Sequence, residues 1–209
     1  MKHISIILSF CFLLILPAKS SYFRNYQVED GLSNNSVWTV LQDSKGYIWF
    51  GTKDGLNRFD GKNMKIYRNK KDDPNSIGHN FIHCIKEDSN KRLLIGTRNG
   101  VYLYNREKDN FKHIIVEKDS TKQVNVNDIL EDPDGNFWIA CHGNGLYKLN
   151  SELIIENHYI SSDEENSIPI NYIWTIIADN YGNLWLGTAG KGLVHFDKNN
   201  NSFTPITNI

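Results

Sequence analysis

The stretch DSKGYIWFGTKDGLNRFD, residues 43–60, decides the fold because its pattern returns three more times along the chain. The further copies run over residues 88–105, 132–150 and 179–197. The central large side chain of each copy is, in order, Trp49, Leu94, Trp138 and Trp185, at intervals of 45, 44 and 47 residues. A period of about 40–50 residues is typical of stacked repeat units, so it takes precedence over any local motif.

Each copy reads as part of a unit of four short strands. In the first unit, apolar and β-branched runs cover residues 37–41, 47–51, 56–59 and 64–67, and clusters of Gly, Asp and Asn separate them. Beyond the first twenty residues, no apolar stripe keeps a helical spacing over ten or more positions. We therefore expect an all-β protein, a β-propeller of about four blades with four antiparallel strands each. The blades are expected near residues 31–68, 77–115, 124–160 and 168–207.

The recurring residues of the unit have structural interpretations. The central Trp is expected to pack between blades and to need a partner for its indole N–H. The Asp that opens each copy is expected to cap its own hairpin turn. The turn glycine predicts a positive φ, and Lys91 in that place predicts either strain or a different turn. The Gly before Thr predicts close approach of strands or blades. These columns are Asp43, Asp88, Asp132 and Asp179; Gly46, Gly135 and Gly182; and Gly51, Gly96 and Gly187, with Ala140 in the third unit.

The unit Asp-x-x-Gly-x-Φ-Trp-Φ-Gly-Thr-x-x-Gly-Leu-x-x-Phe-Asp resembles the two-component regulator propeller repeat, and so does GLSNNSV at residues 31–37. The resemblance covers nearly everything after the first twenty residues and departs from the pattern at Lys91, Leu94 and the pair Ala140 and Cys141. That repeat builds the periplasmic sensor region of hybrid two-component histidine kinases, best known from glycan-using Bacteroidetes. The resemblance implies a ligand sensor, usually with two large propellers in tandem.

Residues 1–20 are interpreted as a secretory signal peptide. A short basic start precedes an apolar core at residues 4–16, and Ala18 and Ser20 flank a small-x-small cleavage site. The core of 13 residues is too short to span a bilayer, which takes about 20. We expect residues 21–209 in the periplasm, with a parent protein anchored in the inner membrane. The alternative is an uncleaved anchor.

Two features favour the N-terminal part of a larger propeller. Residues 22–26 resemble an outermost blade strand, yet the fourth unit has its own outer strand at residues 203–206, so no incomplete blade awaits completion. The family that the chain resembles also uses more blades. A closed four-bladed ring is the alternative, because propellers have about four to eight blades.

Catalytic and metal-site signatures are not found. The seven His have no metal-ligand spacing, and neither a G-x-S-x-G elbow nor a kinase core is present. Cys84 and Cys141 lie in different units without a CxxC motif, and we favour two buried thiols over a disulfide. The balance of 23 basic against 24 acidic residues gives no electrostatic footprint for nucleic acid. We expect no enzymatic activity, no metal and no cofactor.

One column of the repeat varies in its chemistry. Eleven residues before the central Trp or Leu, the units carry Trp38, His83, Asn127 and Trp174. The column before it is uniformly apolar and is expected to be packed: Val37, Ile82, Val126 and Ile173. Innermost strands line the channel of a propeller, where aromatic and hydrogen-bonding groups could hold a sugar ring. We name the varied column as the ligand-binding candidates; the alternative is that its two Trp belong to the inter-blade core.

The functional expectation combines these observations with the resemblance. It is a periplasmic ligand-sensing propeller of a hybrid two-component histidine kinase that detects extracellular carbohydrate. The expected partners are a small-molecule or oligosaccharide ligand, the remaining blades and kinase of the parent sensor, and a second copy in a homodimer, with no nucleic acid. The alternatives are a stand-alone exported propeller that binds or assembles with other molecules, and an enzyme built on the propeller.

Overall fold

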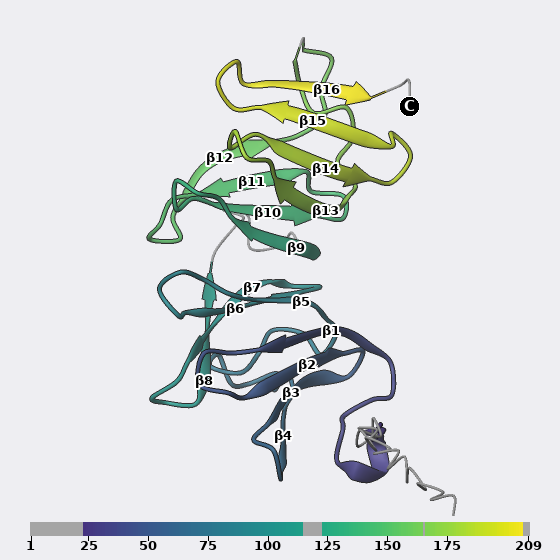
Figure 1. The fold of residues 1–209 in the computed structure, drawn as a ribbon, viewed down its shortest axis with the longest axis vertical. Coiled ribbons are helices and arrows are strands. Elements are labelled where there is room, and N and C mark those ends of the chain that lie inside the picture. Colours follow the sequence, from purple (N-terminus) through teal and green to yellow (C-terminus); the bar gives the residue numbers. More distant parts are fainter. Residues whose placement is uncertain (1–22, 115–122, 165, 207–209) are drawn as a thin grey trace, which may run out of the picture.

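The computed structural model describes residues 23–114, 123–164 and 166–206 (Figure 1). Four four-stranded antiparallel sheets make up these residues, and the only helical turn within them is a 3₁₀ turn, η1 (Val28–Asp30). The expectation of an all-β propeller of about four blades is confirmed. The expected signal peptide and the expected linker at residues 117–122 lie outside the described residues.

The four blades share one plan, in which the strands follow each other from the inside of the sheet to its outer edge. The first blade holds β1 (Val37–Gln42), β2 (Ile48–Thr52), β3 (Gly55–Phe59) and β4 (Met64–Tyr67). The second holds β5 (Ile82–Glu87), β6 (Leu93–Thr97), β7 (Gly100–Asn105) and β8 (Asn110–Ile114). The third holds β9 (Val126–Glu131), β10 (Phe137–Cys141), β11 (Leu146–Leu149) and β12 (Ile155–Tyr159). The fourth holds β13 (Ile173–Ala178), β14 (Leu184–Thr188), β15 (Leu193–Asp197) and β16 (Ser202–Ile206).

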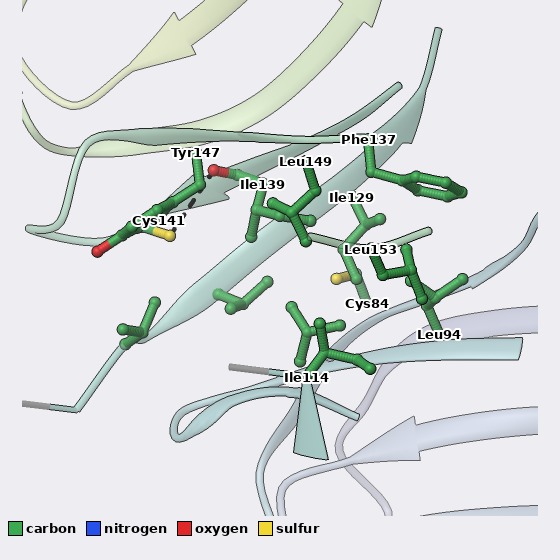
Figure 2. Packing of buried hydrophobic residues seen from close by; sticks show 13 residues of the cluster. Cys84, Leu94, Ile114, Ile129, Phe137, Ile139, Cys141, Tyr147, Leu149 and Leu153 are labelled. Atoms are coloured by element: carbon green, nitrogen blue, oxygen red, sulfur yellow. Dashed lines mark hydrogen bonds between the residues drawn. The ribbon is translucent and has the colours of Figure 1, made fainter. Parts of the chain in front are cut away.

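Adjacent blades stack along the long axis of the molecule, and their inner strands β1, β5, β9 and β13 touch in sequence (Figure 1). The first and fourth blades lie at opposite ends of this stack, so the described blades form an open array (Figure 1). An apolar core fills each of the three inter-blade spaces. Figure 2 shows the core between the second and third blades, where Cys84 and Cys141 lie as buried free thiols. Burial raises the pKa of both thiols, so they act as small apolar side chains.

The hairpin between the first two strands of each blade has the same turn in all four units. Gly46 adopts φ 88° and Lys91 adopts φ 63°, so the lysine takes the left-handed conformation that glycine takes elsewhere. Of the two alternatives for Lys91, the strained turn is therefore the observed one. The close approach predicted before Thr is also present: a Cβ on Gly51 would lie 2.7 Å from Ile82 of the next blade.

Two sequence expectations are wrong. Residues 23–27 form no strand. The side chain of Asp30 bonds the backbone N–H of Gln27 at 3.0 Å, and the resulting η1 turn leads the chain over the first blade. Tyr26 then packs on Phe59 with ring centroids 5.0 Å apart, in place of strand pairing. Val37 is 40% exposed although its column was expected to be packed, because no blade of the described array covers the near side of β1.

Candidate ligand-binding site

All four candidate residues occupy the same kind of irregularity in their inner strands. In the first blade Val37 pairs with Thr52 and Thr39 with Gly51, which leaves Trp38 as an extra, unpaired residue. The same one-residue register shift falls at His83, Asn127 and Trp174. A β-bulge releases its extra residue from the pleat and re-aims the side chain. The repeat therefore presents its most variable column on four equivalent bulges at one end of the inner strands.

An aromatic cluster surrounds the first two bulges. The indole of Trp38 contacts the ring of Phe81 edge-on at 5.2 Å and that of His83 at 5.9 Å, measured between centroids. Phe81 and His83 stack on each other at 4.4 Å. The guanidinium of Arg98, from the turn between β6 and β7, lies 4.3 Å from the centroid of Phe81. Two of the predicted residues, Trp38 and His83, are thus brought together, and Phe81 and Arg98 complete the group.

His83 is a half-buried side chain whose imidazole has a lowered pKa. Burial, as the largest cause, and the nearby charges of Arg98, His142 and His79 together lower the pKa of its imidazole to about 4. Its Nε2 atom is buried and has no hydrogen-bond partner within the described structure. A buried polar atom without a partner carries an uncompensated desolvation cost of about 1–3 kcal/mol. Such an atom is a reason to look for a ligand at the same place.

The other two bulges differ from the first pair. The side-chain amide of Asn127 donates to the backbone carbonyl of Ile173 at 2.7 Å, so it ties the third blade to the fourth. Trp174 lies 5.3 Å from the ring of His142, which also contacts Tyr172 at 4.9 Å. The Oδ1 atom of Asn125 is buried without a partner in the described structure, and the backbone carbonyl of the same residue accepts from the N–H of His142. Asn127 therefore joins two blades, whereas Trp174 belongs to a second aromatic group with His142 and Tyr172.

The exposure of the two tryptophans bears on the alternatives for them. Trp38 is 52% exposed and Trp174 is 49% exposed, so neither lies in a core between the described blades. The central tryptophans Trp49 and Trp138, by contrast, are fully buried between blades. Half-exposed indoles on the inner strands are available surfaces for stacking.

Sequence reasoning missed three contributors, Phe81, Arg98 and His142. Phe81 precedes its strand and lies outside the repeated motif. Alignment of the units could have singled out Arg98 and His142. Both directly follow the Gly-Thr position, where the first unit has Lys53. That hairpin end adjoins the bulge through the pairing of Ile82 with Thr97, a contact that only strand register reveals.

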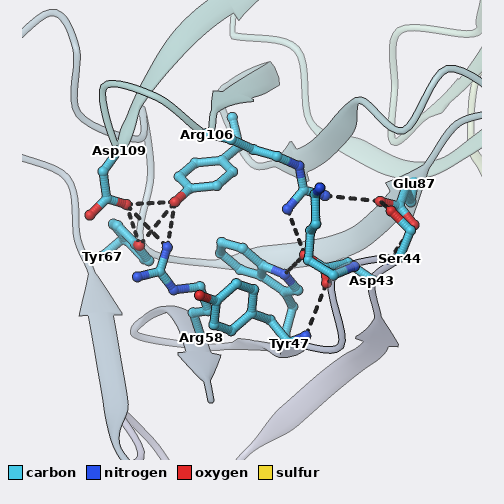
Figure 3. Close-up of polar contacts among 11 residues, drawn as sticks. Asp43, Ser44, Tyr47, Arg58, Tyr67, Glu87, Arg106 and Asp109 are labelled. Atoms are coloured by element: carbon cyan, nitrogen blue, oxygen red, sulfur yellow. Dashed lines mark hydrogen bonds and ion pairs between the residues drawn. The ribbon is translucent and has the colours of Figure 1, made fainter.

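The opposite end of the inner strands carries a structural network, shown in Figure 3. The Oδ2 atom of Asp43 accepts from the indole N–H of Trp49 at 2.9 Å and from Arg106 of the next blade at 2.7 Å. Arg106 also bonds Glu87, whose carboxylate holds the backbone N–H and hydroxyl of Ser44 (Figure 3). Every charge in this network has a partner, so it joins blades and offers no free group to a ligand. Within the described ranges, no three His, Cys, Asp or Glu side chains gather as a metal-ligand set.

Two family models match the chain. The model of the SMP-30/Gluconolactonase/LRE-like region matches residues 44–170, more than half of the chain. The model of the two component regulator propeller matches residues 31–54 and 167–190, which are the ends of the repeat array. By the extent of its match, the chain belongs to the family of the SMP-30/Gluconolactonase/LRE-like region. The two component regulator propeller is the family that the repeat motif predicted, and that prediction is confirmed.

Known relatives include a histidine kinase and extracellular domains from Bacteroides. Histidine kinase P4 of Formosa agariphila is 45% identical over 82 residues, which are 37% of this chain and 6% of that protein. The extracellular domain assigned to the hybrid two component system BT4673 of B. thetaiotaomicron is 28% identical with a TM-score of 0.72, over 82% of this chain and 25% of that one. A second structure of a BT4673 extracellular domain, assigned to a one component system, is 27% identical with a TM-score of 0.75, over 87% and 27%.

This two component regulator propeller is thus a homologue of the extracellular domain of a hybrid two-component system, and it spans about a quarter of the solved domains. Across the described residues, no helix combines the length and the apolar character needed to cross a membrane.

Proposed function

We propose that this propeller is the periplasmic ligand-sensing part of a hybrid two-component histidine kinase and that its ligand is a carbohydrate. The observation that carries the proposal is the column of bulges that aims half-exposed indoles, Trp38 and Trp174, away from the inter-blade cores. Homology to extracellular domains of hybrid two-component systems supports the sensor role and the location outside the inner membrane.

Carbohydrate is the ligand class that best fits this surface. A sugar ring has an apolar face of C–H groups and an edge of hydroxyls, so it pairs with an aromatic face that is flanked by hydrogen-bonding groups. The first two bulges offer this combination in Trp38 and His83, and the last two offer it in Trp174 and His142. The two groups lie on different blades, which suits an oligosaccharide that spans the array.

Signalling needs the rest of the parent protein. A ligand shifts a conformational equilibrium only by its difference in affinity for the two states. We propose that a saccharide held across several blades favours one relative arrangement of these blades and of those that follow, and so biases a dimeric kinase. The partners are the remaining blades, the kinase and a second copy of the chain.

Intrinsic tryptophan fluorescence and isothermal titration with a panel of oligosaccharides test this proposal on the full chain. We expect Trp38→Ala and Trp174→Ala each to weaken binding about fivefold, because a stacked aromatic contact contributes about 1 kcal/mol. Trp185→Ala is the matched control, since Trp185 is partly exposed but lies outside the bulge column. Binding that persists unchanged in both bulge variants would contradict this assignment of the site.

A further inference from the structure

We infer that the saccharide taken by the first two bulges is acidic, with a carboxylate or sulfate group that Arg98 binds. This inference rests on the proposed function and goes further by naming the chemical class of the ligand. It comes from the distribution of charge around Trp38, Phe81 and His83.

Cationic side chains follow the Gly-Thr position at the end of the blades where the bulges lie. Lys53 follows Thr52 and Arg98 follows Thr97, while these two threonines pair with Val37 and Ile82, the residues before the bulges. In the third blade His142 takes this place, after Cys141, which pairs with Val126. The strand register therefore places a basic residue (Lys53, Arg98 or His142) beside three of the four bulges.

The charges of Lys53 and Arg98 are not neutralised within the part of the chain that the structure describes. Both residues are exposed, and neither side chain forms an ion pair or a hydrogen bond there. Asp54, the residue after Lys53, does not neutralise it. The carboxylate of Asp54 accepts hydrogen bonds from the guanidinium of Arg68 at 3.0 and 3.2 Å and from the side-chain amide of Asn80 at 3.0 Å. Because the whole chain carries a formal net charge of only −1, this positive patch is a local feature.

The position of Arg98 prepares it for an anion. Its guanidinium rests on the face of Phe81 at 4.3 Å from the ring centroid, an arrangement that restricts the side chain without using its N–H groups. A planar guanidinium recognises carboxylate and sulfate oxygens through two parallel hydrogen bonds. Its positive charge also acts on His83 and disfavours protonation of the imidazole. The site thus offers one cation with free donors beside a neutral imidazole.

The three side chains can act on one sugar residue. Trp38 lies 5.2 Å from Phe81, and Arg98 lies 4.3 Å from the same ring, so a saccharide against the indole places its substituents within reach of the guanidinium. A neutral sugar would use the indole and the imidazole but leave the guanidinium without a counter-charge.

The test compares three tetrasaccharides of equal length by isothermal titration with the full chain: tetragalacturonate, a sulfated galactan tetrasaccharide and the neutral galactotetraose. We expect one or both acidic probes to bind at least tenfold more tightly than the neutral probe, with affinity that falls as salt is raised. The two acidic arms separate carboxylate from sulfate recognition. Titrations with galacturonate monomer alone and with inorganic sulfate alone show whether the acidic group binds in the absence of the rest of the oligosaccharide.

Substitutions assign the effect to Arg98. We expect Arg98→Gln to weaken binding of the acidic probe about tenfold or more and to leave the neutral probe unaffected, because hydrogen bonds between charged groups are stronger than those between neutral groups. Arg98→Lys keeps the charge but loses the planar fork, so we expect an intermediate affinity. Lys45→Gln, an exposed cation at the opposite end of β1, is the matched control. Thermal unfolding of each variant verifies that it is folded.

The outcomes separate the two proposals. Equal binding of neutral and acidic probes, or acidic binding that Arg98→Gln leaves unchanged, overturns the inference while carbohydrate binding at the bulges stands. No binding of any saccharide overturns the inference and the proposed function together.

Discussion

Asp43 and Asp132 each hold a hairpin and a central tryptophan together. One carboxylate oxygen accepts from two backbone N–H groups of the turn, and the other accepts from the indole N–H of Trp49 or Trp138 at 2.9 Å. A cation of the following blade, Arg106 or Lys198, binds that same second oxygen. A short side chain thus caps its own turn and also reaches the residue that fills the space between blades.

The second unit shows how the network accommodates Leu94 in place of Trp. No indole is available there, and Arg92 donates its Nε–H to the Oδ2 atom of Asp88 at 2.5 Å instead. The guanidinium also bonds the carbonyl of Ser151 in the third blade at 2.9 Å, which supplies the inter-blade link. Arg92 therefore replaces two partners found in the first and third units, the indole and the cation from the next blade.

Arg92→Ala tests this replacement. The change leaves the carboxylate of Asp88 buried without its side-chain donor, so we expect a loss of about 1–3 kcal/mol in the free energy of unfolding. Chemical denaturation measures it. In the Asp88→Asn background the same change should cost clearly less, because the buried charge is gone; equal costs in both backgrounds would contradict the coupling.

Asp109 makes stability depend on acid pH. Burial alone would raise the pKa of its carboxyl, but Lys65, Tyr104 and Tyr67 donate to it and lower the pKa from 3.8 to about 2. A carboxyl with a depressed folded-state pKa adds stability above pH 3.8 that is lost as the pH falls towards 2. We expect unfolding by urea to become easier across this window.

The variant Asp109→Asn should be less stable at pH 5 and should lose less stability between pH 4 and pH 2. The matched control is Asp72→Asn, because Asp72 is exposed and has no hydrogen bond or ion pair in the described ranges. A pH profile of Asp109→Asn that runs parallel to that of the unmodified chain would show that this carboxylate does not cause the effect.

At the scale of the strands, the glycine before Thr sets how closely blades can approach. The inner strand of the next blade lies over this glycine, so that a Cβ on Gly96 would fall 2.8 Å from Val126 and would also meet Cys84. No described blade follows the fourth blade, and a Cβ on Gly187 would meet its own inner strand at Thr175, 2.9 Å away. The same motif residue is therefore confined from two sides in one blade and from one side in another.

Gly96→Ala is expected to lower the free energy of unfolding by about 1–3 kcal/mol, the range for an overpacked interior. Gly187→Ala is its matched control and should cost less, because the methyl of Thr175 is the end of a side chain that can turn away. Chemical denaturation of both variants measures the difference. Similar losses in the two blades would show that crowding within a sheet outweighs the approach between blades.

At the scale of the whole molecule, the four blades form a row in which each one contacts only its neighbours. Stability of such an array is close to a sum over blades and over the interfaces between them. The three interfaces are apolar and buried, while the far side of the fourth blade leaves Ile177 61% exposed and Trp185 partly exposed. The indole of Trp185 contacts the ring of His195 at 4.7 Å between centroids, and the carboxylate of Asp179 accepts from backbone N–H groups of its turn.

The contribution of an interface can be read from the central tryptophans. We expect Trp138→Ala to cost about 3–5 kcal/mol, since it empties a buried site and removes the donor to Asp132. Trp185→Ala should cost much less in the same chain, because its indole is neither enclosed nor bonded to Asp179. Equal losses, measured by chemical denaturation, would mean that the far side of the fourth blade is covered in solution, as in a homodimer.

The sequence by itself determined the repeat, the four-stranded blade, the family and the turn chemistry. These follow from local rules: the spacing of apolar runs, glycine where φ must be positive, and Asp where a hairpin needs a cap. It also singled out the column of Trp38, His83, Asn127 and Trp174 through its chemical variety. The strand expected at residues 22–26 failed because a local capping contact at Gln27 and Asp30 turns the chain.

Only the tertiary structure decided where the side chains of that column lie. Strand register placed each of its members on a bulge, and packing then divided them: Asn127 joins two blades, whereas Trp38 and Trp174 remain half exposed. Phe81 and Arg98 entered the site because the turns of a blade meet at one end of its inner strands. Register and the stacking of blades depend on contacts between residues distant in sequence, and no local pattern carries that information.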